Sequence, residues 1–436
     1  MRSVLLPLGL AALCFNPSFA QQYATSGGAD PASALRITAN LTTEPAAPLT
    51  LQSALDLALA ASPTLSAAAR EVEAIEAGIV QAGARRNPEV SLFADDTQRS
   101  TRETTLLFSQ PIELGGKRGA RIEAAERSRD SALAELAATR AEIRGNTIAA
   151  YFEVLASQER LQLAQSSVDL AGRAREAAAK RVTAGKVSPV EETKARVAES
   201  AARIEFNQAK SELAIARNRL SAVWGNPVAR FERAEGAVDE LPPLISSDDL
   251  NARLQIAPAL VRARREVERR RALTEVERRR RVPDITLSLG ARRNEDLGRS
   301  SAVFGVAIPI PVFDRNQGNV LEAVRRTDKA RDELSATEIR LASHLSAVQG
   351  RLDAARQEIQ TLRDEILPGS QSAFDAATKG YQLGKFSFLE VLDAQRTLFQ
   401  ARSQYLRALA GAQRSVAEIE GLLGQASLLA PTVGSP

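Results

Sequence analysis

The stretch KRVTAGKVSPVE, residues 180–191, returns later in the chain as KGYQLGKFSFLE, residues 379–390. The two copies lie 199 positions apart, which is the distance from Gly185 to Gly384. A second pair of similar stretches has nearly the same spacing, with RRNPEVSL at residues 85–92 and RRVPDITL at residues 280–287. A repeat of this length contains a whole series of elements, so the sequence predicts two related halves that arose from one duplicated unit.

Long segments with a helical composition lead up to the two copies of the turn. Residues 119–182 and 318–380 contain few prolines or glycines and are rich in Ala, Glu, Arg and Leu. Pro368 is expected to bend the second of these helices. Shorter helices are expected at residues 49–60, 64–86, 189–224 and 388–424. Apolar residues in the second long segment alternate steps of four and three, which predicts a heptad seam: Leu341, Leu345, Val348, Leu352, Ala355, Ile359, Leu362 and Ile366.

Each half also contains two short segments in which apolar and polar residues alternate. They predict one hairpin from residues 89–96 and 103–110 and another from residues 284–290 and 301–310. In the last segment Phe304, Val306, Ile308 and Ile310 are expected to share one face. Four strands are too few to close a barrel, which needs about eight. Two alternatives stay open: three chains could supply twelve membrane-spanning strands, or a soluble sheet could cover helices.

The ends of the chain differ from the two halves. Residues 1–20 have the parts of a secretory signal peptide, with Arg2, an apolar run and the small residues Ser18 and Ala20. Cleavage there would remove Cys14, and Leu13 before it argues against lipid attachment. Residues 21–48 and 425–436 are expected to be flexible. The two repeats are predicted to span residues 49–242 and 243–424.

Composition excludes several functions. The chain has a single histidine, His344, and a mature chain without cysteine or methionine would lack soft metal ligands. With no nucleophile-base pair or cofactor loop, we expect neither an enzyme nor a resident metal or cofactor. Residues 261–281 contain ten arginines and four glutamates, but the interspersed glutamates and the lack of aromatic residues predict a solvated helix, so we expect no nucleic-acid partner.

Three further stretches carry a resemblance to a known family. They are LTLQSALDLAL at residues 49–59, QPIELGGKR at residues 110–118 and PIPVFDRNQG at residues 309–318. Their order and duplication resemble the outer-membrane efflux, or TolC, family, in particular its heavy-metal-efflux branch. The resemblance implies a homotrimer in the outer membrane of a Gram-negative bacterium, with a twelve-stranded β-barrel in the lipid and a long α-helical barrel in the periplasm. It also implies the exit duct of a tripartite pump for divalent cations, with a periplasmic adaptor and an inner-membrane transporter of the RND type.

The same resemblance implies roles for particular residues. The two turns would be periplasmic tips that contact the adaptor, through Arg181, Gly185, Lys186, Gly384, Lys385 and Ser387. The entrance constriction would be formed by Glu390, Asp393 and Tyr381, although Phe386 stands where the family often has a gating arginine. Lys194 takes the place of Asp393 in the first copy. The crossings from strand to helix would be made by Pro111, Gly115, Gly116, Pro309, Pro311 and Gly318.

Two alternatives to these roles remain. Carboxylates also favour the first turn of a helix, so Glu390 and Asp393 could simply mark a helix start. The whole chain could instead be a soluble periplasmic coiled-coil protein that serves as an adaptor or a scaffold.

Overall fold

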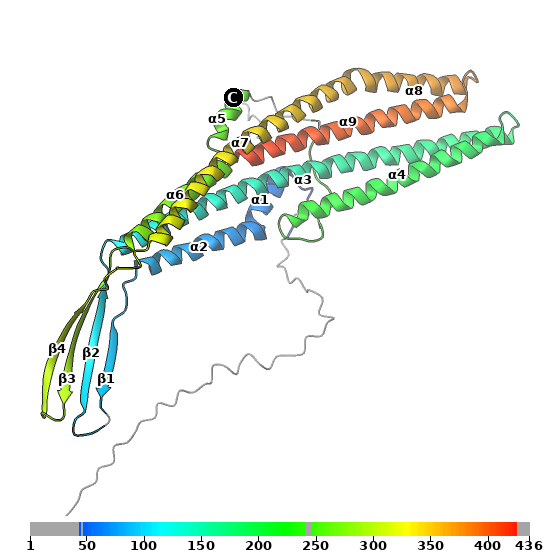
Figure 1. Cartoon of the computed structure of the whole chain (residues 1–436). Coiled ribbons are helices and arrows are strands. Elements are labelled where there is room, and N and C mark those ends of the chain that lie inside the picture. Colours follow the sequence, from blue (N-terminus) through cyan, green and yellow to red (C-terminus); the bar gives the residue numbers. More distant parts are fainter. Residues whose placement is uncertain (1–42, 45–46, 97, 240–245, 425–436) are drawn as a thin grey trace, which may run out of the picture. The chain divides into compact units, whose positions relative to one another are not determined.

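The computed structural model describes residues 43–44, 47–96, 98–239 and 246–424, and Figure 1 shows how their elements are arranged. The predicted signal peptide and the predicted tail at residues 425–436 lie outside this range. The helices are α1 (Leu51–Ala61), α2 (Pro63–Gly83), α3 (Lys117–Thr183), α4 (Pro189–Ala222), α5 (Ser247–Leu254), α6 (Pro258–Arg279), α7 (Gln317–Thr361), the π-helical turn η1 (Leu362–Ile366), α8 (Leu367–Gln382) and α9 (Phe388–Leu423). The strands are β1 (Glu89–Asp95), β2 (Glu103–Ile112), β3 (Ile285–Asn294) and β4 (Arg299–Ala307). The mainly helical class with a small β part is therefore confirmed.

Helix α3 is the longest element of the described residues. Its 67 residues extend for about 100 Å at the usual rise of an α-helix, and α2, α4, α6 and α9 pack along it. Alanines recur every seven positions on α3 and α4 and are buried, which lets these two helices approach closely: Ala164, Ala171, Ala178, Ala195, Ala202, Ala209 and Ala216. None of the helices in the described part of the chain is both long and apolar enough to cross a lipid bilayer.

The predicted heptad seam forms along α7 and then loses its phase. Its members from Leu341 to Leu362 are buried, except for the half-buried Ala355, but Ile366 is 42% exposed, so its prediction was wrong. Residues 362–366 form a π-helical turn, in which the N–H of Leu367 donates to the carbonyl of Leu362. Pro368 follows directly and has no N–H for the α-helical ladder. The wider turn rotates Ile366 off the seam, and the helix changes direction in this region (Figure 1).

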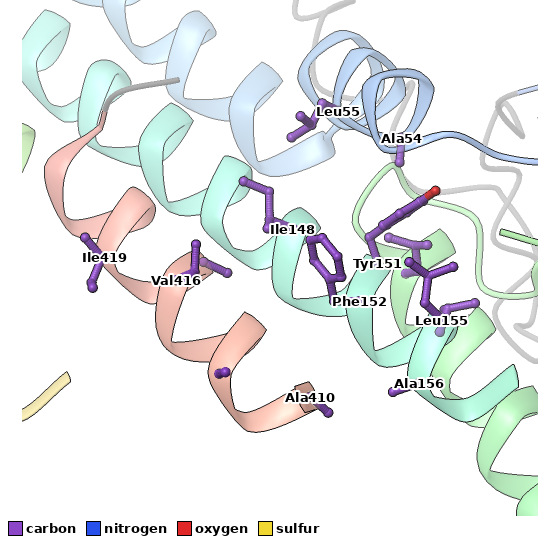
Figure 2. Packing of buried hydrophobic residues seen from close by; sticks show 14 of the residues in the cluster. Ala54, Leu55, Ile148, Tyr151, Phe152, Leu155, Ala156, Ala410, Val416 and Ile419 are labelled. Carbon is purple, nitrogen blue, oxygen red and sulfur yellow. The ribbon is translucent and has the colours of Figure 1, made fainter. Parts of the chain in front are cut away.

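The main hydrophobic core lies where α1, α3 and α9 meet. Ile148, Phe152 and Leu155 of α3 pack in one buried cluster with Leu55 of α1 and Val416 of α9 (Figure 2). Leucines of the α7 seam belong to the same cluster. This core joins elements of both repeats, so neither half has a separate interior.

Two glycines let α3 and α9 touch at this level. A Cβ placed on Gly145 would lie 2.9 Å from the Cα of Gly421, which is closer than side chains approach backbone. The two helices therefore contact through their backbones, and a side chain at position 145 would push them apart.

A chain segment at the side of the core is fixed by polar contacts. Leu49 forms a parallel bridge with Ala234, and the buried Tyr151 hydroxyl donates to the carbonyl of Leu49 (2.9 Å). Glu44 lies within the predicted flexible segment 21–48, yet its carboxylate accepts four hydrogen bonds. They come from the indole of Trp224 (3.0 Å), the Asn226 amide (2.7 Å) and the backbone N–H groups of Arg230 and Phe231 (2.7 Å each).

The four strands form one antiparallel sheet in the order β1-β2-β3-β4. Strands β2 and β3 come from different repeats and pair over ten residues, from Glu103 with Asn294 to Ile112 with Ile285. The register aligns apolar side chains in rows across the sheet, and most are more than half exposed: Val90, Leu92, Leu106, Phe108, Leu287, Leu289, Phe304 and Val306. The opposite face carries mainly small or polar residues such as Ser91, Thr105, Ser109, Ser288 and Gly305. One face of the sheet is thus apolar and exposed.

The second hairpin differs from its prediction at three points. Strand β3 extends four residues beyond the expected Gly290, to Asn294, because β2 offers a partner along its whole length. The two predicted strands left residues 291–300 between them, and the structure reduces this connection to residues 295–298. Strand β4 ends at Ala307, so Ile308 and Ile310 lie beyond it. The prolines at positions 309 and 311 lack the N–H that a ladder needs, which explains the early end.

Candidate functional site: the helical turns and the acidic pair

The two repeated turns have the same backbone geometry. Gly185 and Gly384 both lie in the left-handed region, with φ of 66° and 73°. In the first turn the N–H of Lys186 donates to the carbonyl of Arg181 (2.9 Å), and in the second the N–H of Lys385 donates to the carbonyl of Gly380 (2.8 Å). Such bonds end a helix by satisfying its last carbonyls, and glycine takes the required conformation without strain.

A serine starts the next helix after each turn. The Ser188 hydroxyl accepts from the N–H of Val190 (3.3 Å) at the start of α4. Ser387 forms a capping box at the start of α9, in which the Glu390 carboxylate accepts from the Ser387 N–H (2.6 Å). The conserved spacing of glycine and serine between the two copies therefore encodes a tight helical hairpin.

An arginine and a tyrosine connect the two turns. The guanidinium carbon of Arg181 lies 4.0 Å from the centre of the Tyr381 ring, and Arg181 also donates to the Tyr381 carbonyl (3.1 Å). Beneath them Tyr381 packs against the buried Ala178 and Ala195, together with Leu392. Residues that the sequence assigned to two separate roles, tip and constriction, are thus in direct contact.

Phe386 occupies the space beside Gly380. A Cβ on Gly380 would lie 2.1 Å from the Cδ2 atom of the Phe386 ring, so a glycine is required there. The aromatic ring of Phe386 is thus packed on its own turn.

Glu390 and Asp393 lie one helical turn apart near the start of α9, and both are exposed. The capping box gives Glu390 a structural role at the start of α9, as the alternative interpretation expected. Only one oxygen of its carboxylate accepts the hydrogen bond from the Ser387 N–H. In the first copy the equivalent positions hold Glu191 and Lys194. The acidic pair therefore belongs to the second hairpin alone.

The described residues contain no group of three or more His, Cys, Asp or Glu that could hold a metal ion. His344, on α7, contacts the Glu418 carboxylate of α9 (2.6 Å), which also accepts from Arg351 (2.7 Å). These three side chains tie two helices together.

The residues expected at the strand-to-helix crossings fall into different environments. Gly115 and Gly116 have φ of 70° and 73°. A Cβ on Gly115 would lie 2.7 Å from that of Val282, so this glycine also permits a close approach. Pro111 lies within β2 opposite Thr286. Pro309 and Pro311 lie between β4 and α7.

Gly318 does not form the second crossing. It lies inside the first turn of α7, and the left-handed residue there is Asn316, with φ of 56°. Asparagine tolerates this conformation better than most residues, because its side chain bonds locally. Asn316 donates to both the backbone carbonyl and the carboxylate of Glu277 (2.8 and 2.9 Å). Sequence reasoning missed this residue, although it stands 200 positions after Gly116 and so close to the repeat spacing.

Sequence reasoning also missed a group of charges at the first crossing. Asp284 accepts from Lys117 (2.6 Å) and from the N–H of Leu114 (3.3 Å), and Glu113 accepts from Arg121 (2.9 Å). The hydrogen bond from Arg121 lowers the pKa of Glu113. Burial alone would raise the pKa of Asp284, but the hydrogen bonds from Lys117 and Leu114 hold it below its ordinary value.

Solved structures of two outer-membrane proteins share this fold of long paired helices joined to a four-stranded sheet. The outer membrane protein VceC of Vibrio cholerae has a TM-score of 0.72 at 21% identity, over 86% of this chain and 96% of that one. The CmeC outer membrane channel of Campylobacter jejuni has a TM-score of 0.73 at 17% identity, over 86% and 85%.

The chain belongs to the outer membrane efflux protein family, whose model matches residues 54–226 and 250–425. It is therefore an outer-membrane efflux protein. A similar sequence is that of the cobalt-zinc-cadmium resistance protein CzcC of Cupriavidus metallidurans, which is 46% identical over 98% of this chain and all of the relative.

Proposed function

We propose that this chain is the outer-membrane exit duct of a tripartite pump that carries divalent heavy-metal cations out of the periplasm. A periplasmic adaptor would contact the duct, and an inner-membrane transporter of the RND type would supply the energy for export. The observation that carries the proposal is the exposed acidic pair beside the second turn, in a chain 46% identical to a protein named for cobalt, zinc and cadmium resistance.

A trimer would complete the sheet. Its order leaves β1 and β4 as open edges, one from each repeat. Three chains joined edge to edge would give twelve strands, enough to close a barrel. The exposed apolar face from Val90 to Val306 would then face lipid and the face with Ser109 and Ser288 would line the interior, as in outer-membrane barrels.

A stripe on α4 supports the same association. Val190, Val197, Ile204 and Ile215 are 57%, 65%, 61% and 52% exposed. Val197 and Ile204 stand two positions after the buried Ala195 and Ala202, which places the stripe about 200° around the helix, opposite the seam with α3. Three of these residues repeat every seven positions and Ile215 follows eleven positions later on the same face. An apolar stripe of this kind on the free side of a helix favours a further helix that covers it, and we assign that helix to a neighbouring chain.

The acidic pair would line the entrance. In a trimer Glu390 and Asp393 would place six carboxylates around one axis, a field that attracts cations and repels anions. Tyr381, held by Arg181, would set the position of this region relative to the first hairpin. Selection among metals would fall to the pump's other components, because carboxylates alone discriminate poorly between divalent cations.

The two turns would form the surface for a periplasmic adaptor. Arg181, Gly185 and Lys186 belong to the first, and Gly384, Lys385 and Ser387 to the second. Leu383 and Leu389 are 64% and 59% exposed beside the second turn. Exposed backbone, two lysines and apolar side chains together make a surface that a helical hairpin could cover.

Complementation tests the transport role. Cells that retain the adaptor and transporter of a cobalt-zinc-cadmium pump but lack its channel should regain zinc tolerance and accumulate less zinc when they express this chain. If the chain is present in normal amounts in the outer membrane but zinc accumulation does not change, the proposal that the duct carries zinc is refuted.

The rival function is a soluble periplasmic scaffold. The mass of the detergent-extracted protein, corrected for detergent, separates the two functions. A trimer in the outer-membrane fraction supports the duct, and a monomer or dimer in the soluble periplasmic fraction supports the scaffold.

A further inference from the structure

A cavity of about 790 Å³ lies where α2 ends, α3 begins and α6 ends. Among the described residues, five basic side chains line it and only one carboxylate, that of Glu113. The basic side chains are Arg85, Arg86, Lys117, Arg121 and Arg280. None of the proposed channel functions uses this group.

Nearby carboxylates neutralise only part of the charge. Lys117 is paired with Asp284 and Arg121 with Glu113, and Arg280 with Glu277 (2.6 Å). Both Glu113 and Asp284 have a lowered pKa, so they are ionised at neutral pH and the pairs are intact. Two of the five cations remain in excess over these three carboxylates.

Arg85 and Arg86 account for the excess. Arg86 lies 3.7 Å from Glu113 and 3.8 Å from Asp284, both of which already have a closer cation. Both arginines are exposed, and no hydrogen bond or ion pair within the described residues engages the Arg85 side chain. Two guanidinium groups that line one cavity repel one another, and an anion bound between them would reduce that repulsion.

The nearby residues Arg118 and Arg121 have a structural role that Arg85 and Arg86 do not share. Arg118 donates to the carbonyl of Gly83 (2.6 Å) and Arg121 to that of Ala84 (3.5 Å). These two arginines therefore cap the negative end of α2. Arg85 and Arg86 follow that end of α2 and do not cap it.

We propose that this cavity is a binding site for a phosphate group, held by Arg85 and Arg86 with Arg280 at its side. Guanidinium groups bind phosphate oxygens through pairs of parallel hydrogen bonds, which favours phosphate over a spherical anion. The phosphate can come from a phospholipid headgroup or from free inorganic phosphate.

The position of the cavity indicates which source of the phosphate group to expect. Asn87 lines it two residues before β1 begins, and Glu113 directly follows β2. It therefore adjoins the end of the sheet whose apolar face is exposed, the level at which lipid headgroups lie if that face is in the membrane. The lipid source thus rests on the proposed function, whereas the anion site does not.

Calorimetric titration of the full-length protein in detergent tests the site. The probes are dihexanoylphosphatidylglycerol, a short-chain phospholipid, and inorganic phosphate. We expect saturable binding of at least one probe, weakened by about tenfold or more in the double variant Arg85→Gln with Arg86→Gln, because both phosphate-binding forks are lost. The matched control is Arg173→Gln with Arg196→Gln, which removes the same charge from α3 and α4 far along the sequence from the cavity.

Each outcome decides a separate point. Binding of the lipid alone assigns the site to a headgroup, and equal binding of inorganic phosphate assigns it to a free anion. Saturation by neither probe, or equal affinity in the cavity variant and the unsubstituted protein, overturns the proposal. Mass and channel conductance of the same preparation keep the proposals apart, since a conducting trimer that binds neither probe refutes only the phosphate site.

Discussion

The guanidinium group of Arg181 stacks on the ring of Tyr381, 4.0 Å from its centre, and donates a hydrogen bond to the backbone carbonyl of the same residue (3.1 Å). One residue belongs to the end of α3 and the other to the end of α8. These helices come from different repeats, so this contact fixes one helical hairpin relative to the other.

Replacing Arg181 with alanine should loosen the two turns. The change removes a cation–π contact of about 0.5–2 kcal/mol together with a hydrogen bond to a carbonyl. We expect a higher single-channel conductance of the purified protein in planar bilayers, because the second hairpin can then move away from the first. Arg173→Ala is the control, since Arg173 is an exposed residue of the same helix. Equal conductance in Arg181→Ala and the unsubstituted protein would contradict this coupling.

Substitution of Gly384 should destabilise the protein, although no residue other than its chain neighbours lies within 4 Å of the place that a Cβ would take. Its φ of 73° lies in the left-handed region. A residue with a Cβ is destabilised in that conformation by about 1 kcal/mol. We expect Gly384→Ala to lower the apparent midpoint of thermal unfolding. Gly350→Ala is a matched control, because Gly350 is exposed inside α7 with open space around it, and alanine there should stabilise by about 0.5–1 kcal/mol. The same shift for both variants would refute a conformational cause.

The acidic pair allows a test of charge alone. Glutamine at position 390 can still accept the Ser387 N–H, so Glu390→Gln keeps the capping box and removes the charge. We expect Glu390→Gln with Asp393→Asn to abolish the block of single-channel current by divalent cations, because the field that concentrates them is lost. Glu192→Gln, which neutralises a half-buried carboxylate at the start of α4, is the control. Persistent block in the double variant would exclude the pair from the entrance.

Glu44 should make the fold sensitive to acid. Burial alone would raise its pKa, but hydrogen bonds from Asn226, Trp224 and two backbone amides hold the pKa below its ordinary value of 4.5. A lowered pKa in the folded state stabilises the fold above about pH 4.5, and this stability is lost as the pH falls through the folded value. Trp224 is the only tryptophan of the chain, so its fluorescence reports on the contact directly.

We expect the Trp224 emission to shift below about pH 4.5 and the shift to vanish in Glu44→Gln. The neighbouring exposed carboxylate of Glu232 offers a control, and Glu232→Gln should keep the transition. An unchanged acid transition in Glu44→Gln would show that another group controls the fluorescence.

The sequence predicted local features well where the cause is local. Gly185 and Gly384 end their helices as expected, since a left-handed residue followed by a serine cap needs only a few neighbouring residues. Pro368 was correctly expected to disturb its helix. The exposure of Ile366 was not foreseen, because a proline can be accommodated by a kink or by a π-helical turn, and only the packing of the helix decides between them.

Contacts between the repeats could not be predicted from the sequence. Asp284 with Lys117 and Arg181 with Tyr381 are separated by 167 and 200 positions, and although the second separation is close to the repeat spacing, a repeat does not say that its two copies touch. The extra length of β3 has the same origin, because the strand continues as long as β2 offers it hydrogen-bonding partners.

The sequence by itself determined the duplication, the long helices, the hairpins and the tight turns, because heptads, alternation, glycine and proline act on the chain within a few residues. Only the tertiary structure decided that β2 pairs with β3, that Arg181 lies on Tyr381 and that Arg85 and Arg86 line a cavity. Those arrangements depend on how the helices of both repeats share one core, and the free energy of that packing belongs to no single segment.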